Sequence, residues 1–212
     1  MIFNKHLECE GKHSLLGASK HAWLNDTDEK LMDRYVNSFS AAIGTLAHEY
    51  AKNKITYRQP MEDNNSEKNA LLLYLLMNGI PADVIDIDSL FYNLLPYVND
   101  AIGYKMTPEQ VLYYSDISFG TADTICYGRN LLRIHDLKTG ASPASMDQLM
   151  IYAAWFFLEY KKEVNFQKSR TELRIYQNRE VLCHTPTNVD ILAIMEKIVH
   201  GAMVIKENFV EV

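Results

Sequence analysis

The residues most able to do chemistry lie in "LLRIHDLKTG", residues 131–140. The apolar content of this stretch predicts a buried strand, in which successive side chains point to opposite faces. Asp136 and Lys138 therefore share one face with Leu132 and Ile134. A carboxylate and an ammonium together at the end of a core strand could bind a cation or act on a reacting group.

A second carboxylate approaches this pair if the preceding stretch forms a hairpin. "SFGTADTICY" and "LLRIHDLKT" are joined by "GRN", which favours a tight turn. With the turn near Arg129, Asp123 lies beside Asp136 at a Cβ separation of about 5 Å. Two like charges so placed are destabilising unless a cation offsets them, and carboxylate oxygens suit Mg²⁺ or Mn²⁺. Lys138 could then orient or deprotonate a water, or stabilise charge on a phosphate.

Composition limits the classes of protein to consider. The 212 residues are 48% hydrophobic and 23% charged, which predicts one globular domain with an ample core. A net charge of -6 argues against a polybasic nucleic-acid binder, but is compatible with a site where a metal meets a phosphate. Cys9, Cys126 and Cys183 form no CxxC pair, which favours a reduced intracellular protein. No stretch approaches the roughly 18 apolar residues of a membrane span, and the N-terminus lacks a signal-like apolar region, so we expect a cytoplasmic protein.

The elements that must position these residues fall into two parts of one domain, residues 1–212. Residues 1–108 are expected to be mostly helical, with Pro96 kinking or dividing the last helix. The expected helices in this part cover residues 18–26, 28–55, 70–78 and 88–106. Residues 109–212 contain short β-branched and aromatic runs that predict the order β-β-β-α-β-α, with Ser142 capping the first of these two helices. The fold class expected is therefore α+β.

The order of the motifs carries a resemblance to a known family. An Asp-x-Lys pair alone is more often a solvated strand edge than a site. "GTAD", "IHDLKTG" and "DQLMIYAAW" together, however, resemble the RecB-like branch of the PD-(D/E)XK nuclease superfamily, in which an aspartate, a D-x-K strand and a Q-x-x-x-Y helix follow one another. "HSLLGASKHAWLN" and "AAIGTLAHEYA" look like the opening of phage and prophage members. The resemblance implies a restriction-endonuclease-like core, a β-hairpin-containing mixed sheet flanked by helices, with a helical N-terminal half.

The resemblance also assigns roles to residues. It implies that His48, Asp123 and Asp136 hold the metal, with the Leu137 carbonyl as a further ligand, and that Lys138 is the catalytic lysine. In isolation, His48 would be better explained as a histidine at the edge of a helical core. Glu49 beside it could compete as a ligand, although adjacent helical residues point about 100° apart.

Other residues are expected to contact the substrate. Gln148 and Tyr152 share a helical face, which the resemblance directs at the metal and the DNA; an ordinary amphipathic helix shows the same pattern. Ser19 matches a serine of the opening motif, with a DNA or packing contact expected. Lys168, Arg170 and Arg174 belong to the densest basic stretch and could touch phosphates, although a solvated surface explains them equally well.

The function implied is a Mg²⁺- or Mn²⁺-dependent deoxyribonuclease, with an exonuclease of phage or mobile-element recombination or DNA processing as the leading interpretation. Asp26 stands where phage relatives often have a cysteine, so no iron-sulfur cluster is expected. The alternatives are a structure-specific or restriction-like endonuclease, and a catalytically silent nuclease fold that binds DNA or protein. DNA is the expected partner and a membrane is not. Assembly into a homo-oligomer and binding to a phage recombination partner are alternatives left open by the sequence.

Overall fold

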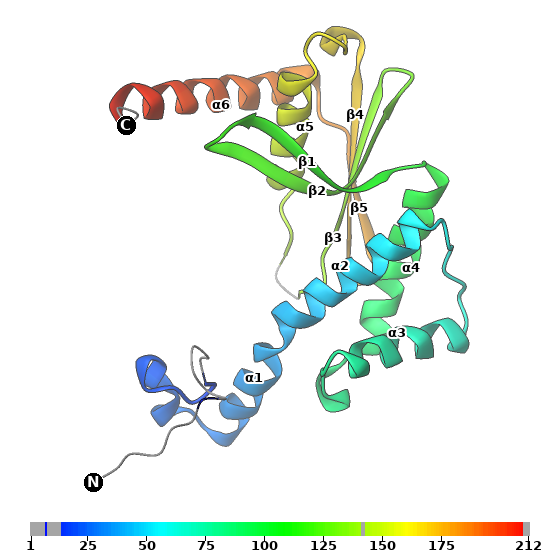
Figure 1. Ribbon diagram of the computed structural model, residues 1–212, viewed down its shortest axis with the longest axis vertical. Helices are drawn as coiled ribbons and strands as arrows, with labels where there is room; N and C mark the ends of the chain where they lie inside the picture. Colours follow the sequence, from blue (N-terminus) through cyan, green and yellow to red (C-terminus); the bar gives the residue numbers. More distant parts are fainter. Residues whose placement is uncertain (1–6, 8–13, 141–142, 210–212) are drawn as a thin grey trace.

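The computed structural model describes Leu7, residues 14–140 and residues 143–209. Its architecture is α+β, with a five-stranded mixed sheet flanked by helices and a helical N-terminal half (Figure 1). The helices are α1 (Asp28–Ser38), α2 (Ser40–Thr56), α3 (Asn65–Met77), α4 (Ile87–Gly103), α5 (Asp147–Glu159) and α6 (Asn188–Phe209). The strands are β1 (Thr107–Ser115), β2 (Ser118–Gly128), β3 (Leu131–Leu137), β4 (Arg170–Gln177) and β5 (Glu180–His184). The fold class expected from the sequence is confirmed.

The sheet has the order β1-β2-β3-β4-β5, and neighbouring strands are antiparallel except for the parallel pair β3 and β4. The β2–β3 hairpin closes at the Gly128–Leu131 pair. Its two loop residues, Arg129 and Asn130, have φ of +53° and +57°, which is the backbone of a tight hairpin turn. The hairpin is therefore centred where the sequence predicts it.

Helices cover the two faces of the sheet and form two hydrophobic clusters. On one face, α5 and α6 pack over Leu132 and Ile134, which are fully buried. On the other face, α2, α3 and α4 form a second cluster that includes Leu137 at the end of β3. The alternation of Ile134 and Leu137 between the clusters follows the alternation of a strand.

Polar side chains cap the N-terminal ends of α1, α3, α4 and α6, which satisfies backbone N–H groups that have no partner within a helix. The Thr27 hydroxyl accepts from the Lys30 N–H at the start of α1, and Asn64 accepts from the Glu67 N–H at the start of α3. At the start of α6, the Thr187 hydroxyl accepts from the Asp190 N–H.

Three details of the expected helices and strands need correction. The helix expected over residues 28–55 is divided at Phe39 into α1 and α2. Gly44 lies inside α2, where an added Cβ would be 3.1 Å from the Thr139 hydroxyl, so it allows α2 to approach the chain just after β3 closely. α4 continues through Pro96 and is not divided.

The third correction is an additional strand. β5 follows a turn at Asn178 and Arg179, both with positive φ, and pairs with β4. The order is therefore β-β-β-α-β-β-α. All five residues of β5 are exposed, so the strand has no buried alternating face to reveal it in the sequence. α5 begins at Asp147, and Ser142, expected as a helix cap, lies outside the described residues.

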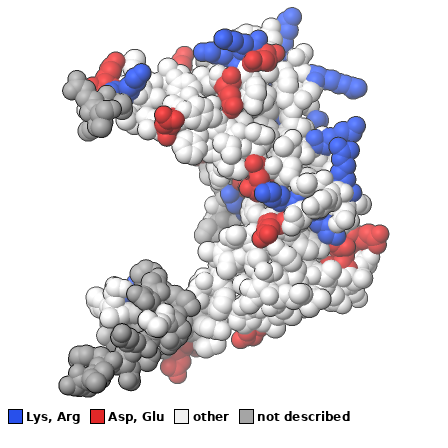
Figure 2. Space-filling model, in the orientation of Figure 1, with Lys and Arg blue, Asp and Glu red and all other residues white. Residues whose placement is uncertain are grey.

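The surface is hollowed between the N-terminal segments and α6 (Figure 2). Lys and Arg side chains gather in this view near the β2–β3 turn and the segment before β4, away from the hollow. Within the described part of the chain, no helix is both long and apolar enough to cross a membrane.

Candidate active site

Asp123 and Asp136 meet where β3 ends beside the middle of β2. The last pair of this ladder is Thr124 with His135, so the two aspartates follow it directly on neighbouring strands. The Leu137 N–H donates to the Asp123 Oδ2 atom at 2.9 Å. The hairpin thus brings the first carboxylate to the end of the strand that carries the second.

Asp136 is almost completely enclosed, with 1% of its surface exposed. The Lys138 Nζ atom donates to Asp136 Oδ1 at 3.1 Å and lies 2.9 Å from Oδ2. The Oδ2 contact is an ion pair without hydrogen-bond geometry, and this atom has no hydrogen-bond partner among the described residues. A buried carboxylate oxygen therefore keeps an unused acceptor position, which is unusual because buried polar atoms are normally paired.

A chain of hydrogen bonds connects β3 to α5. The Lys138 Nζ atom also donates to Gln148 Oε1 at 2.9 Å, and Gln148 Nε2 donates to the Tyr152 hydroxyl at 2.8 Å. Gln148 and Tyr152 are one helical turn apart, as their spacing predicts. Because the Gln148 amide nitrogen is used by Tyr152, its oxygen is directed at the lysine.

His48 projects from α2 toward the same point. Its Nδ1 atom lies 3.5 Å from Asp123 Oδ2, and the Leu137 backbone also interacts with the ring. Glu49, the neighbouring residue, interacts instead with Tyr74 of α3, where burial and the Glu49 charge raise the pKa of the Tyr74 hydroxyl. The structure therefore brings His48, Asp123, Asp136, Leu137 and Lys138 into one site.

Glu109 of β1 is a site residue that the sequence analysis missed. One potential ligand atom from each of His48, Glu109 and Asp123 lies within 4.8 Å of the others. The flanking pairs Pro108–Thr124 and Gln110–Ala122 place Glu109 opposite Asp123. The three side chains line a pocket of about 520 Å³ between α2, β1 and β2. Only the β1–β2 register could have revealed Glu109, and no sequence motif marks it.

Burial and charge set the protonation of the two aspartates. Burial raises the pKa of Asp123 to about 6, with the Glu109 charge adding to the rise and the Leu137 N–H and Lys138 opposing it. Burial also raises the pKa of Asp136 to about 6, with the Asp123 charge contributing and Lys138 and His48 opposing. Both carboxyls are still mostly ionised at neutral pH, but they lose their protons less readily than exposed aspartates.

His48 responds to burial in the opposite way. Burial lowers its pKa, while the charges of Asp136 and Glu109 oppose the change. The ring is therefore mostly neutral at pH 7, and a neutral imidazole has a nitrogen lone pair with which it can bind a metal. Among the described residues, the ligand atoms within 4.8 Å of one another come from His48, Glu109 and Asp123, and two carboxylates with one neutral imidazole suit a divalent cation. Asp136 lies next to this group and is paired with Lys138.

The expected DNA-binding residues of β4 do not join this site. Arg170 pairs in register with Leu131, six residues before Leu137, which puts it and Lys168 about 20 Å from the end of β3. Arg174 forms ion pairs with Asp100 at 2.7 Å and with Glu172 at 3.0 Å. Contacts of Lys168, Arg170 and Arg174 with DNA stay a prediction. The ion pairs of Arg174 argue against a contact between its guanidinium and a phosphate.

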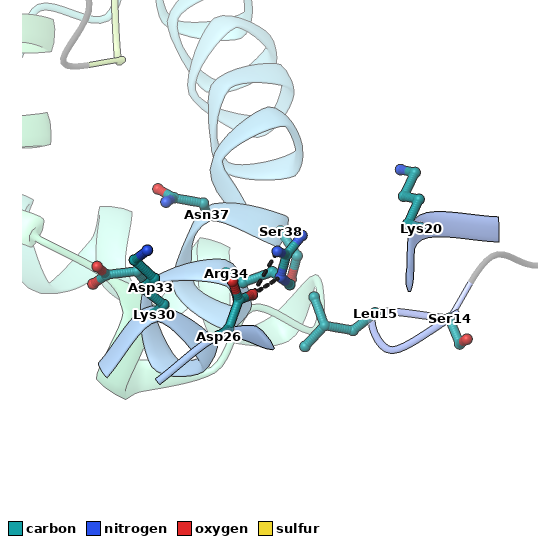
Figure 3. Close-up of a pocket in the computed structure, with 9 residues that line it drawn as sticks. All are labelled: Ser14, Leu15, Lys20, Asp26, Lys30, Asp33, Arg34, Asn37 and Ser38. Atoms are coloured by element: carbon teal, nitrogen blue, oxygen red, sulfur yellow. Dashed lines mark hydrogen bonds and ion pairs between the residues drawn. The ribbon is translucent and has the colours of Figure 1, made fainter. Parts of the chain in front are cut away.

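Ser19 is also remote from the carboxylates. It is exposed in the 3-10 segment Ala18–Asn25, which lies beside α1 and away from the sheet (Figure 1). A pocket of about 800 Å³ next to this segment is lined in part by Lys20, Lys30 and Arg34 (Figure 3). Arg34 is already paired with Asp26 at 2.9 Å, and the pocket contains none of the expected site residues.

Comparison with known proteins gives a family without an activity. A family model described as "Protein of unknown function (DUF2800)" matches residues 13–199. No curated protein and no solved structure matches the chain. The matched range includes every residue of the site described above.

Proposed function

The chain belongs to the DUF2800 family, and because the family description gives no activity, we propose from the site itself that the protein is a divalent-metal-dependent deoxyribonuclease. The observation that carries this proposal is the buried Asp136, one oxygen of which lacks a hydrogen-bond partner, with Asp123 next to it and Lys138 against it. In a purely structural role the two like charges would repel each other, with Lys138 as the cation paired to Asp136.

The donor set fits Mg²⁺ or Mn²⁺. Asp123, Asp136 and the Leu137 carbonyl are the oxygen ligands expected from the sequence, His48 is the expected nitrogen ligand, and Glu109 adds a further carboxylate. These cations prefer oxygen ligands and retain sites for water and phosphate oxygens. When bound, such an ion polarises a phosphate and lowers the pKa of a water that attacks it.

The remaining residues suit the hydrolysis of a phosphodiester. The Lys138 ammonium is held between Asp136 and Gln148, where it can donate a hydrogen bond to the attacking water or to a phosphate oxygen. Gln148 fixes the direction of the ammonium, and Tyr152 fixes the amide of Gln148. Lys138 acts on the substrate, and Gln148 and Tyr152 keep the Lys138 ammonium in place.

DNA as the substrate is supported by the resemblance to RecB-like nucleases together with this site. The acidic net charge of -6 is compatible with it, because a bound cation would neutralise part of the local negative charge. An exonuclease in phage or mobile-element recombination or DNA processing, acting in the cytoplasm, remains our preferred interpretation. A homo-oligomer or a recombination partner is compatible with it.

Three DNA topologies distinguish the activities. Wild-type protein is incubated with linear, nicked and closed-circular DNA of one sequence, each with Mg²⁺, with Mn²⁺ and with chelator. An exonuclease shortens the linear DNA and leaves the closed circle intact, whereas an endonuclease linearises or nicks the circle. No metal-dependent cleavage of any form would mean that the fold is catalytically silent, and the proposal would be wrong.

A further inference from the structure

Two buried side-chain amides hold the segment that follows Lys138. Asn93 of α4 and Gln177 of β4 are each 4% exposed. We propose that Asn93 and Gln177 are positioning residues, which fix the Lys138 backbone and the approach to α5 so that the Lys138 ammonium meets Gln148. This inference rests on the proposed function.

Asn93 fixes the backbone of Lys138 from the helical layer. Its Nδ2 atom donates to the Lys138 carbonyl at 3.4 Å, and its Oδ1 atom accepts from the Arg179 N–H at 2.7 Å. The Lys138 N–H donates to the Tyr176 carbonyl at 3.0 Å. Both backbone polar groups of the lysine are therefore bonded, one to β4 and one to α4.

Gln177 binds two described residues between Lys138 and α5, Gly140 and Ala144. Its Nε2 atom donates to the Gly140 carbonyl at 2.6 Å, and its Oε1 atom accepts from the Ala144 N–H at 3.2 Å. Ala144 lies three residues before the start of α5 at Asp147. The entry of the helix that carries Gln148 is thus tied to the end of β4.

The two amides share an anchor at the β4–β5 turn. Gln177 is the last residue of β4, and Arg179, which donates to Asn93, belongs to the turn that follows. β5 therefore has a role, because its pairing with β4 holds the turn that orients both amides.

Asn93 and Gln177 are placed where they can set the geometry of the contact between Lys138 and Gln148. These two residues come from different elements, and their side chains meet at 2.9 Å. A shift of about 1 Å between catalytic groups can lower a rate by about a hundredfold. Buried amides must be hydrogen-bonded in any fold, but here three of the bonds go to Lys138, Gly140 and Ala144, which lie between the end of β3 and the start of α5.

Asn99 provides a matched control. It lies on the same helix, its Oδ1 atom accepts from the Met61 N–H at 2.8 Å, and its Nδ2 atom donates to the Met61 carbonyl at 2.9 Å. Asn99→Leu therefore removes the same number of side-chain bonds to the backbone as Asn93→Leu, six residues further along α4, where both bonds go to Met61 and not to the segment around Lys138. Gln177→Met removes the bonds of the second amide with little change in size.

The test compares metal-dependent DNA cleavage with stability in these variants of the full chain. We expect Asn93→Leu and Gln177→Met to lower kcat about 10- to 100-fold, with KM for DNA and the Mn²⁺-induced rise in Tm unchanged. Asn99→Leu should lower Tm to a similar extent and leave kcat at the wild-type value. Asn93→Ser, which keeps a polar group, serves as a second variant if Asn93→Leu does not fold.

A double-mutant cycle separates positioning from general damage. If Asn93 acts through the Lys138–Gln148 contact, the loss caused by Asn93→Leu should be smaller in a Gln148→Leu background, whereas independent effects would multiply. Hydrogen exchange gives a readout that needs no activity. The Ala144 amide should exchange faster in Gln177→Met, and the Arg179 amide faster in Asn93→Leu, with neither changed in Asn99→Leu.

The outcomes are distinguishable. An inactive wild type would contradict the proposed function and this inference with it. An active wild type with wild-type kcat in Asn93→Leu and Gln177→Met would overturn the inference alone. Equal losses of kcat in Asn93→Leu and Asn99→Leu at equal Tm would also overturn it, because the effect would then follow stability.

Discussion

The Lys138 ammonium lies 2.9 Å from the amide oxygen of Gln148, which is ten residues further along the chain. This contact joins the end of β3 to the first turn of α5. Gln148 is exposed, and its side-chain hydrogen bonds go to Lys138 and to the Tyr152 hydroxyl. Gln148 is therefore expected to matter for activity more than for stability.

Replacement of Gln148 by leucine tests this expectation. Gln148→Leu should lower the rate of metal-dependent DNA cleavage about tenfold or more, because the ammonium loses a charge-assisted hydrogen bond that fixes its direction. The free energy of unfolding should change by less than about 0.5 kcal/mol, as is usual for exposed positions. Gln167→Leu, at another exposed glutamine, is the control and should leave both quantities unchanged. A wild-type rate in Gln148→Leu would remove Gln148 from the site.

The aspartate pair predicts a pH dependence of stability. The pKa of Asp123 and that of Asp136 are raised from the ordinary value to about 6 in the folded protein. Between about pH 4 and pH 6 the folded state therefore binds more protons than the unfolded state, and the pair's contribution to the free energy of unfolding falls as pH rises. This stabilising contribution is fully present below the unfolded pKa and is lost above the folded pKa.

A comparison of variants isolates that contribution. Burial, together with Arg174 and Arg133, lowers the pKa of His135 to about 3, so this residue makes stability rise with pH between about 3 and 6.5. The double variant Asp123→Asn with Asp136→Asn keeps His135, and the difference between the two proteins therefore removes the histidine contribution. Without metal, wild type should lose stability relative to the variant as pH rises from 4 to about 7. Mn²⁺ should restore wild type at pH 7 and leave the variant unchanged. A pH-independent difference would mean that the aspartates do not repel each other in this way.

Glu109 gives a prediction about metal affinity. Glu109→Gln removes a carboxylate whose oxygen lies within 4.8 Å of ligand atoms of His48 and Asp123. The dissociation constant for Mn²⁺, measured by titration calorimetry, should rise about tenfold, which corresponds to about 1.4 kcal/mol. Glu180→Gln on the exposed strand β5 is a charge-matched control. Equal affinities in all three proteins would place Glu109 outside the metal site.

The sequence predicts the parts of the site that depend on local structure. The two-residue turn at Arg129 and Asn130 sets the register of the β2–β3 hairpin, so the proximity of Asp123 to Asp136 follows from residues close in the chain. Gln148 and Tyr152 likewise meet through the spacing of one helix. Local turn and helix chemistry was sufficient in both cases.

Contacts between distant segments could not be predicted in this way. Glu109 reaches the site through the β1–β2 pairing, and Arg174 pairs with Asp100 of α4, 74 residues away. The expected long helix is divided at Phe39, and Gly44 lies within α2 at its close approach to Thr139. These features depend on contacts between distant segments, and the periodicity of the sequence does not indicate which segments come together.

The most direct test of the central claim is the Mn²⁺-dependent cleavage of end-labelled linear DNA by wild type, Asp136→Asn and Lys138→Met purified in parallel. Wild type should shorten or cut the DNA, and chelator should abolish the reaction. Asp136→Asn should lose both Mn²⁺ binding and cleavage, whereas Lys138→Met should keep Mn²⁺ binding and cleave about 10² to 10³ times more slowly. Absence of cleavage by wild type, or cleavage that persists at the wild-type rate in Asp136→Asn, would contradict the assignment of this site as a nuclease centre.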